Sequence, residues 1–197
     1  MKAVLMSINP KYCELISSGK KTVEVRKTKP KLETPFKCYI YCTASNVHEC
    51  LMVNENGAKL IYASNYKTAI PFGGRIANGK VIGEFVCDTI ITDRTFGHDA
   101  LFKAIACMDD AEIAAYCINN EMYGWHISDL VIYDKPKELS EFIRICPEWE
   151  KEEITDKCLE CEHLYTSPID QFLECDYEGE VPITRPPQSW CYVEELR

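Results

Sequence analysis

The segment SGKKTVEVRK, residues 18–27, places ionisable side chains at a glycine turn and along the strand that follows it. Residues two apart on a strand point to the same face, so the carboxylate of Glu24 and the guanidinium of Arg26 can reach one ligand. Cationic groups bind phosphate or another anion, and a carboxylate accepts hydrogen bonds from a base edge or takes part in acid–base chemistry. The segment therefore predicts a binding site whose candidate residues are Lys20, Lys21, Thr22, Glu24 and Arg26.

Local signals indicate the elements that position these side chains. Asn9 and Pro10 suit the first turn of a helix, and apolar residues follow at helical spacing. Gly19 suits the end of that helix, because glycine readily adopts the backbone conformation found there. Between residues 22 and 27, valines alternate with polar residues, which is typical of a strand. We expect the site to form from a short helix, a tight turn and a strand.

The segment SINPKYCELISSGKKTVEVRK resembles the opening of the ASCH family, a branch of the PUA-like β-barrels. The family pattern is a strand, a short helix and then Gly-x-Lys-Thr-x-Glu-x-Arg, and all its positions are filled here, by Gly19, Lys21, Thr22, Glu24 and Arg26. The segments GKVIGEFVCDTI and WHISDLVIYDKPKELSEF resemble the central and closing barrel strands. The resemblance implies an α+β fold, a PUA-like small β-barrel with short flanking helices.

The same resemblance implies a module that binds RNA, a modified nucleoside or a nucleotide in a cleft beside the first helix. Lys20, Lys21 and Arg26 would then contact phosphate or another anionic group. Glu24 would accept a hydrogen bond from a base edge or orient Arg26. Unstacked bases need an aromatic surface, for which there are three candidates: Trp125, Tyr123 and Tyr12. Trp125 also suits a core position at the start of a strand.

Two other classes of function fit these residues. Some ASCH-like proteins are hydrolases that remove the acetyl group from acetylated cytidine with a lysine, a threonine and a glutamate. Lys21 matches that lysine, but Glu24 stands at the threonine position, and Glu121 is a loose candidate for the glutamate. Others are ribonucleases, in which Lys21 and Glu24 would assist cleavage, with His126 or His98 helping. A protein-interaction module that docks a partner through its acidic tail is the remaining alternative.

Charge is unevenly distributed along a chain whose formal net charge is −9. Residues 1–37 hold nine Lys and Arg against three Asp and Glu, whereas residues 147–197 hold four against fourteen. A basic region on an acidic protein suits an anionic ligand at one site, and argues against broad wrapping of nucleic acid. Lysines 27, 29, 31 and 37 suit a solubilising loop equally well. No membrane-length apolar run or signal-peptide pattern is visible, so the expected location is the cytoplasm, without a membrane partner.

The cysteines of the chain fall into two groups. Twelve cysteines among 197 residues are fewer than a disulfide scaffold carries, and most are expected to be buried free thiols. The last four lie in an acidic segment poor in apolar residues: Cys158, Cys161, Cys175 and Cys191. A structural Zn²⁺ held by these thiolates, or by His163 in place of one, would supply folding energy. Only the first pair has zinc-knuckle spacing, and an irregular tail with incidental cysteines is the alternative.

The remaining pattern predicts a small barrel. Strands are expected over residues 3–8, 22–27, 36–42, 59–63, 80–92, 125–133 and 189–194. Two short helices are expected between residues 98 and 119, the second capped by Asp109 or Asp110. We expect an ASCH/PUA-like barrel domain over residues 1–146. Residues 147–197 would form an acidic, cysteine-rich tail with a terminal strand docked on the barrel.

Overall fold

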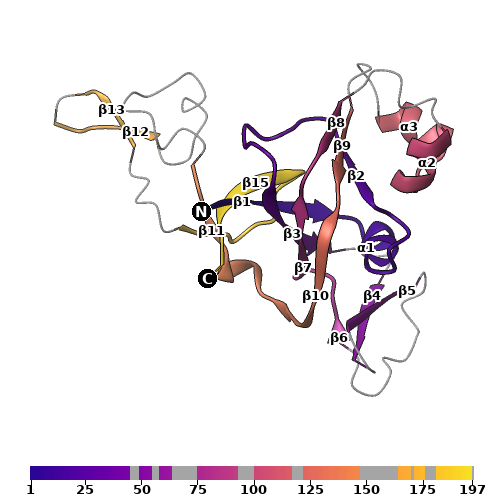
Figure 1. Cartoon of the computed structure of the whole chain (residues 1–197). Coiled ribbons are helices and arrows are strands. Elements are labelled where there is room, and N and C mark those ends of the chain that lie inside the picture. Colours follow the sequence, from indigo (N-terminus) through magenta and orange to yellow (C-terminus); the bar gives the residue numbers. More distant parts are fainter. Residues whose placement is uncertain are drawn as a thin grey trace.

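The computed structural model describes residues 1–44, 49–54, 58–63, 75–92, 100–116, 122–146, 164–169, 171–175 and 181–196. Its largest sheet has the strand order β10-β7-β3-β1-β15-β11-β14 (Figure 1). These strands are β1 (Lys2–Ile8), β3 (Phe36–Cys42), β7 (Lys80–Cys87), β10 (Ser128–Lys137), β11 (Ile143–Arg144), β14 (Val181–Pro182) and β15 (Trp190–Glu194). β1 runs parallel to β3 and antiparallel to β15.

Smaller sheets and short helices complete the described chain. A second sheet joins β2 (Val23–Arg26), β9 (Tyr123–His126) and β8 (Ile90–Thr92), in that order. A third joins β5 (Ala58–Ala63), β4 (Glu49–Asn54) and β6 (Arg75–Ile76), and β12 (Leu164–Thr166) pairs with β13 (Leu173–Cys175). The helices are α1 (Pro10–Ser17), α2 (Ala100–Ala106), α3 (Asp110–Tyr116) and the 3-10 turn η2 (Leu139–Glu141). The expected α+β class is confirmed. The described strands have an open order, so closure into a barrel stays a prediction.

The predicted first helix and its boundaries are confirmed. The Asn9 side chain accepts a hydrogen bond from the backbone N–H of Lys11 at 3.0 Å, and Pro10 occupies the first turn. At the other end, Gly19 has φ +72°, a conformation that costs other residues energy. Cys13 and Ile16 face the main core. The helix thereby fixes the chain that leads into β2.

β2 has two buried faces with different neighbours. Val23 and Val25 form an apolar cluster with Phe102, Ala106 and residues of α3, which lies beside β2 in Figure 1. The opposite face carries Glu24 and Arg26, which line a pocket with α1 and the end of β1. The alternation of valines with polar residues therefore placed the two faces correctly.

The two ends of the chain meet at the main sheet. β15 pairs with β1 over the register from Lys2↔Glu194 to Met6↔Trp190, and the backbone N–H of Glu195 donates to the carbonyl of Met1 at 2.8 Å. The expected C-terminal strand therefore exists and lies next to β1. The division into domains at residue 146 stays a prediction.

The hairpin β12–β13 lies apart from this sheet in Figure 1. Two large apolar side chains at its turn are exposed, Ile169 by 93% and Phe172 by 70%. None of the helices in the described ranges is long and apolar enough to cross a membrane.

Candidate functional site

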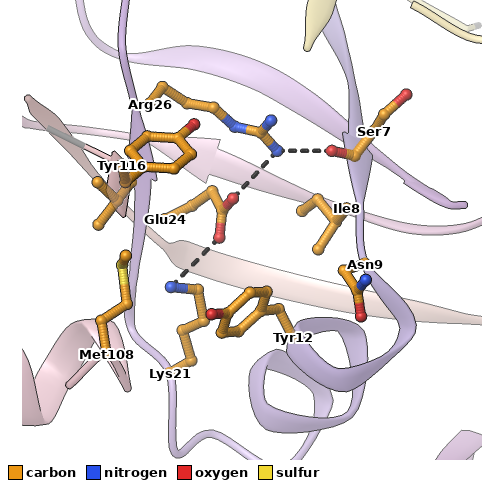
Figure 2. Close-up of a pocket in the computed structure, with 10 residues that line it drawn as sticks. Ser7, Ile8, Asn9, Tyr12, Lys21, Glu24, Arg26, Met108 and Tyr116 are labelled. Carbon is orange, nitrogen blue, oxygen red and sulfur yellow. Dashed lines mark hydrogen bonds and ion pairs between the residues drawn. The ribbon is translucent and has the colours of Figure 1, made fainter. Parts of the chain in front are cut away.

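A pocket of about 200 Å³ opens where α1, β2 and α3 converge on the end of β1 (Figure 2). The end of β1 and the start of α1 supply one wall, and the polar face of β2 supplies another. Its lining residues are Ser7, Ile8, Asn9, Tyr12, Lys21, Glu24, Val25, Arg26, Met108 and Tyr116. Three of the five residues predicted from the decapeptide therefore line it.

Glu24 lies at the centre of this pocket between two cations. Its Oε1 is 3.0 Å from Nη2 of Arg26, and its Oε2 is 3.3 Å from Nζ of Lys21. All three residues are at least nine-tenths buried, with exposed fractions of 6% for Glu24, 6% for Arg26 and 2% for Lys21. Removing such charges from water costs several kcal/mol per ion unless partners compensate. The pair of Glu24 with Arg26 is therefore no solvated surface contact.

The ammonium of Lys21 is used inside the protein. Nζ donates to the carbonyl oxygen of Ala106 at 2.6 Å and lies 4.9 Å from the centroid of the Tyr12 ring. Glu24 is its third neighbour, with Oε2 3.3 Å from Nζ in an ion pair. Lys21 consequently holds the end of α2 and the Glu24 carboxylate together.

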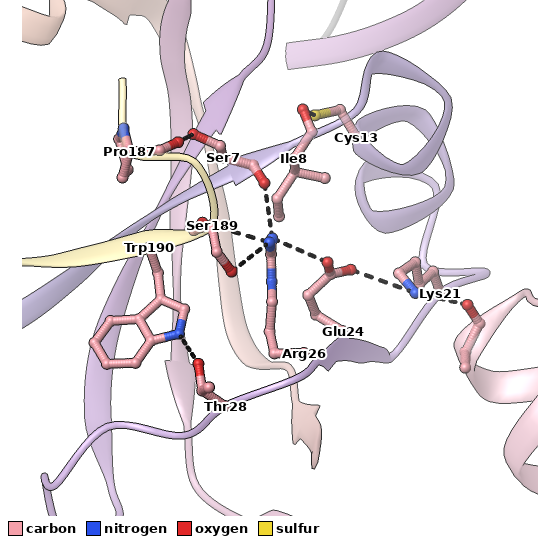
Figure 3. A network of polar contacts seen from close by, with 11 residues as sticks. Ser7, Ile8, Cys13, Lys21, Glu24, Arg26, Thr28, Pro187, Ser189 and Trp190 are labelled. Carbon is pink, nitrogen blue, oxygen red and sulfur yellow. Dashed lines mark hydrogen bonds and ion pairs between the residues drawn. The ribbon is translucent and has the colours of Figure 1, made fainter. Parts of the chain in front are cut away.

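Arg26 is held by both ends of the chain (Figure 3). Nη2 donates to the carbonyl oxygen of Ser7 at 2.8 Å, and Nη1 lies 3.4 Å from both the carbonyl and the hydroxyl oxygen of Ser189. The Ser7 hydroxyl in turn donates to the carbonyl of Pro187 at 2.6 Å. The segment that leads into β15 thus supports one wall of the pocket.

Three buried polar atoms accept or donate no hydrogen bond among the described residues. They are Oε2 of Glu24, Nε of Arg26 and Nε1 of Trp125. All three side chains lie on one face of the paired strands, since Glu24 is the register partner of Trp125. Buried polar groups in proteins are nearly always paired, so the Glu24 oxygen in the pocket is a candidate for a ligand contact.

Tyr12 is fixed in the pocket wall by Glu112 of α3. Its hydroxyl donates to Oε1 of Glu112 at 3.0 Å, and Nζ of Lys11 lies 2.8 Å from the same oxygen. Hydrogen bonding to Lys11, more than any other contact, lowers the pKa of the Glu112 carboxyl. Burial, and then the Glu112 carboxylate, raise the pKa of the Tyr12 hydroxyl well above its usual range. Tyr12 is therefore a neutral donor at physiological pH.

Several predicted residues lie elsewhere. Lys20 is exposed and contributes no side chain to the pocket lining, and Thr22 is occupied in backbone hydrogen bonds to Ile105 and Ile127. Trp125 is fully buried in the main core, with its ring 5.6 Å from that of Phe36 in an edge-on contact. It offers no stacking surface in this structure, which agrees with the core interpretation of this residue.

The histidine proposed to assist cleavage is also remote from the lining. Nδ1 of His126 lies 2.6 Å from Oδ1 of Asp88, and both side chains are about two-fifths exposed. His126 follows Trp125 on β9 and so points to the opposite face. Glu121 and His98 fall outside the described residues.

The predicted zinc ligands are largely outside the described part of the chain. Cys158, Cys161 and His163 are not in it, and of Cys175 only the backbone in β13 is. Cys191, in β15, packs against the apolar cluster around Phe142, and burial raises the pKa of its thiol to about 11. The described residues contain no group of three metal-binding side chains. Zinc binding stays a prediction.

The sequence analysis did not predict the pocket residues that come from the region of α3. Tyr116 and Met108 enter from α3 and from the turn before it. The sequence predicted these helices, and the Asp109 cap is confirmed by its acceptance of the Glu112 N–H at 2.8 Å. No local signal indicated that the helices pack over β2, because that depends on tertiary contacts.

Known proteins resemble this chain over most of its length. A family model described as ASCH domain matches residues 6–150. None of the curated proteins matches. Among solved structures, the ASCH protein from Zymomonas mobilis is 18% identical over 70% of this chain and 73% of that one, with a TM-score of 0.48. A point variant of that protein is 18% identical over 71% and 77% of the two chains, with the same TM-score.

Proposed function

This chain belongs to the ASCH domain family, and on that premise we propose that its pocket binds the base of an RNA, a modified nucleoside or a nucleotide. The observation that carries the proposal is the buried Oε2 of Glu24 in the pocket, which forms the ion pair with Lys21 but accepts no hydrogen bond among the described residues. An N–H group of a base would supply that hydrogen bond. Charge-assisted hydrogen bonds of this kind are among the stronger ones in proteins.

The pocket walls suit one planar ring. Tyr12 and Tyr116 contribute aromatic rings, and Met108 adds a polarizable side chain that adapts to irregular surfaces. A volume of about 200 Å³ lies below the roughly 300–1,000 Å³ of drug-sized ligand sites, so a single ring system is the expected occupant. Stacking on aromatic side chains tolerates any base, and hydrogen bonding to Glu24 would select among them.

The cations take supporting roles in this proposal. Lys21 neutralises Glu24 and holds the carboxylate in place, instead of contacting phosphate itself. Arg26 orients Glu24 from the other side and keeps its Nε unused. Polar groups that are already ordered in the free protein raise affinity, because binding then loses less conformational entropy.

A hydrolase acting on acylated nucleosides or on RNA is the second candidate. It is favoured by the 3.3 Å contact between Lys21 and Glu24 in a buried pocket, since a lysine and a carboxylate held together can act as general acid and base on a bound substrate. The chain carries Glu24 where the acetylcytidine hydrolases have a threonine. The hydroxyl groups in the lining are those of Ser7, Tyr12 and Tyr116, and the first two donate to protein acceptors.

The test is a titration of the purified protein with a panel of nucleosides, nucleotides and short RNAs, with product analysis of the same mixtures. Glu24→Gln should weaken binding by about tenfold or more, because it removes a charged acceptor. Glu14→Gln is the matched control, since this carboxylate lies on α1 outside the pocket lining. Affinity unchanged by Glu24→Gln in a folded variant would refute the proposal. Product formation that depends on Lys21 and Glu24 would favour the hydrolase.

A further inference from the structure

Three lysines follow the pocket strand without a carboxylate partner. Lys27, Lys29 and Lys31, here called the basic strip, are exposed and make no ion pair with any carboxylate in the described residues. Five other exposed or half-exposed lysines have a carboxylate oxygen within ion-pair distance: Lys11, Lys37, Lys80, Lys103 and Lys137. Lys20 and Lys135 are exposed without such a partner among the described residues, but they stand alone, whereas the three lysines of the strip follow one another at every second position. A chain of net charge −9 thus leaves these cations unpaired beside the pocket.

Two of the three ammonium groups lie over tyrosine rings. Nζ of Lys27 is 5.1 Å from the ring centroid of Tyr116, and Nζ of Lys29 is 5.7 Å from that of Tyr123. Tyr116 lines the pocket, so the strip begins at the pocket wall. Tyr123 is the register partner of Arg26, so the second contact lies near the end of β2. The cations and rings therefore form a short path that leads away from the Glu24 site.

An ammonium over a ring keeps its N–H donors for other partners. The attraction of a lysine to a tyrosine face is about 0.5–1 kcal/mol at exposed sites, which positions the side chain without consuming its hydrogen bonds. Alternating cations and aromatic faces match a single nucleic-acid strand, in which charged phosphates alternate with stackable bases. A free nucleoside has no group that would reach beyond the pocket to these lysines.

We propose that the basic strip binds the phosphodiester backbone of a single-stranded nucleic acid, one base of which occupies the Glu24 pocket. This inference rests on the proposed function and names the ligand of that site as a polynucleotide strand. Lys27 contacts the phosphate next to the pocket base, and Lys29 contacts the next one along. Because the strip holds few cations, it contacts only a small number of phosphates. The net negative charge of the protein disfavours more extensive contact with a polyanion.

The experiment compares two probes, a single-stranded RNA of about eight nucleotides and the mononucleotides from which it is made. Fluorescence anisotropy over a range of salt concentrations is measured for the wild type, Lys27→Gln/Lys29→Gln and the control Lys137→Gln. Lys137 is a matched control because its Nζ also lies over a tyrosine, Tyr133, but on β10, outside the pocket lining.

In the double variant we expect RNA affinity to fall about tenfold and the slope of log K against log salt to become shallower by roughly 1.4, since each single-strand phosphate contact contributes about 0.7. Mononucleotide binding should weaken less than RNA binding, because a mononucleotide offers one phosphate to Lys27 and none to Lys29, and the control should be unchanged. RNA that binds no more tightly than mononucleotides would overturn the proposal that the basic strip binds phosphates. Equal effects in the double variant and the control would overturn it too. Either result would leave the pocket proposal standing. Equal competition by a poly-glutamate peptide would overturn its assignment to nucleic acid. Failure of both probes to bind would overturn both proposals.

Discussion

Arg26 lies against Ser189 across 163 residues of sequence, with its Nη1 3.4 Å from both oxygens of that serine. The other terminal nitrogen, Nη2, donates to the carbonyl of Ser7 in β1. One pocket guanidinium is therefore fixed by the first strand and by the entry to the last one. The pocket and the C-terminal strand form one structural unit.

Removal of residues 181–197 is expected to prevent folding. β1 would lose its antiparallel partner β15, the buried Val193 and the support of Arg26. Far-UV circular dichroism and the dispersion of amide NMR signals measure this directly. Ser189→Ala is the matched control, because it removes only one long contact and should cost less than about 1 kcal/mol. A truncated chain that unfolds cooperatively would contradict the role of β15.

Lys21→Met is expected to destabilise the protein by about 3–5 kcal/mol, because it leaves the buried Glu24 beside a vacated partner position. Lys21→Met/Glu24→Leu should cost less than the sum of the two single changes by about 1 kcal/mol or more. Urea unfolding of the four proteins gives these free energies. Strict additivity would show that the two charges do not stabilise each other.

Gly124→Ala tests the packing of α2 on β9. A Cβ atom there would lie 2.9 Å from Cε2 of Phe102 and from Cγ1 of Val23, so one side must move. The expected cost is about 1–3 kcal/mol. Phe102→Leu added to Gly124→Ala should recover part of this loss, since it removes the ring edge. A variant with wild-type stability would contradict the close contact of α2 with this strand.

Trp125→Phe should leave ligand binding unchanged, because the indole is buried in the core and does not line the pocket. Its Nε1 has no hydrogen-bond partner among the described residues, so losing that N–H carries no penalty. We expect a cost below about 2 kcal/mol, against roughly 3–5 for Trp125→Ala. Loss of binding in a stable Trp125→Phe protein would restore the tryptophan as a contact residue.

Glu112 is expected to make the free energy of unfolding fall as the pH is lowered. Its pKa is lowered below the ordinary 4.5, chiefly by the hydrogen bond with Lys11, so the unfolded chain binds the proton more tightly than the native protein. Its stabilising contribution is therefore fully present above about pH 4.5 and is lost as the pH falls through the lower native pKa.

The free energy of unfolding is measured for the wild type and Glu112→Gln at several pH values on both sides of that range. The difference between the two proteins should be largest at the upper end and should shrink as the pH falls. A difference that grows on acidification would show that the native pKa of Glu112 is raised.

Sequence patterns predicted three of the residues that line the pocket, because these residues belong to one local segment. The Asn9 cap, Gly19 and the alternation along β2 were sufficient to place α1 and to turn Glu24 and Arg26 to one face. The burial of Glu24 and Arg26 could not be predicted from the local sequence. The ten-residue pattern was also compatible with a solvated pair. Packing removes both faces of β2 from water, with α2 and α3 against the valines and with α1 and the end of β1 beside Glu24 and Arg26.

Other parts of the site depend on contacts between distant segments. Tyr116 and Ser189 reach the pocket through helix packing and strand pairing, for which a single sequence carries no local signal. Lys21 was expected to contact phosphate, and its engagement with the carbonyl of Ala106 follows from where α2 ends. Such placements are set by tertiary structure.

Whether the Glu24 pocket is a ligand site can be measured by an amide NMR titration with a single-stranded RNA of about eight nucleotides. We expect the largest chemical-shift changes in residues 7–12, at residues 21–26 and around Tyr116. Changes confined to the β12–β13 hairpin or to the far edge of the main sheet, with the pocket signals unmoved at saturation, would contradict it.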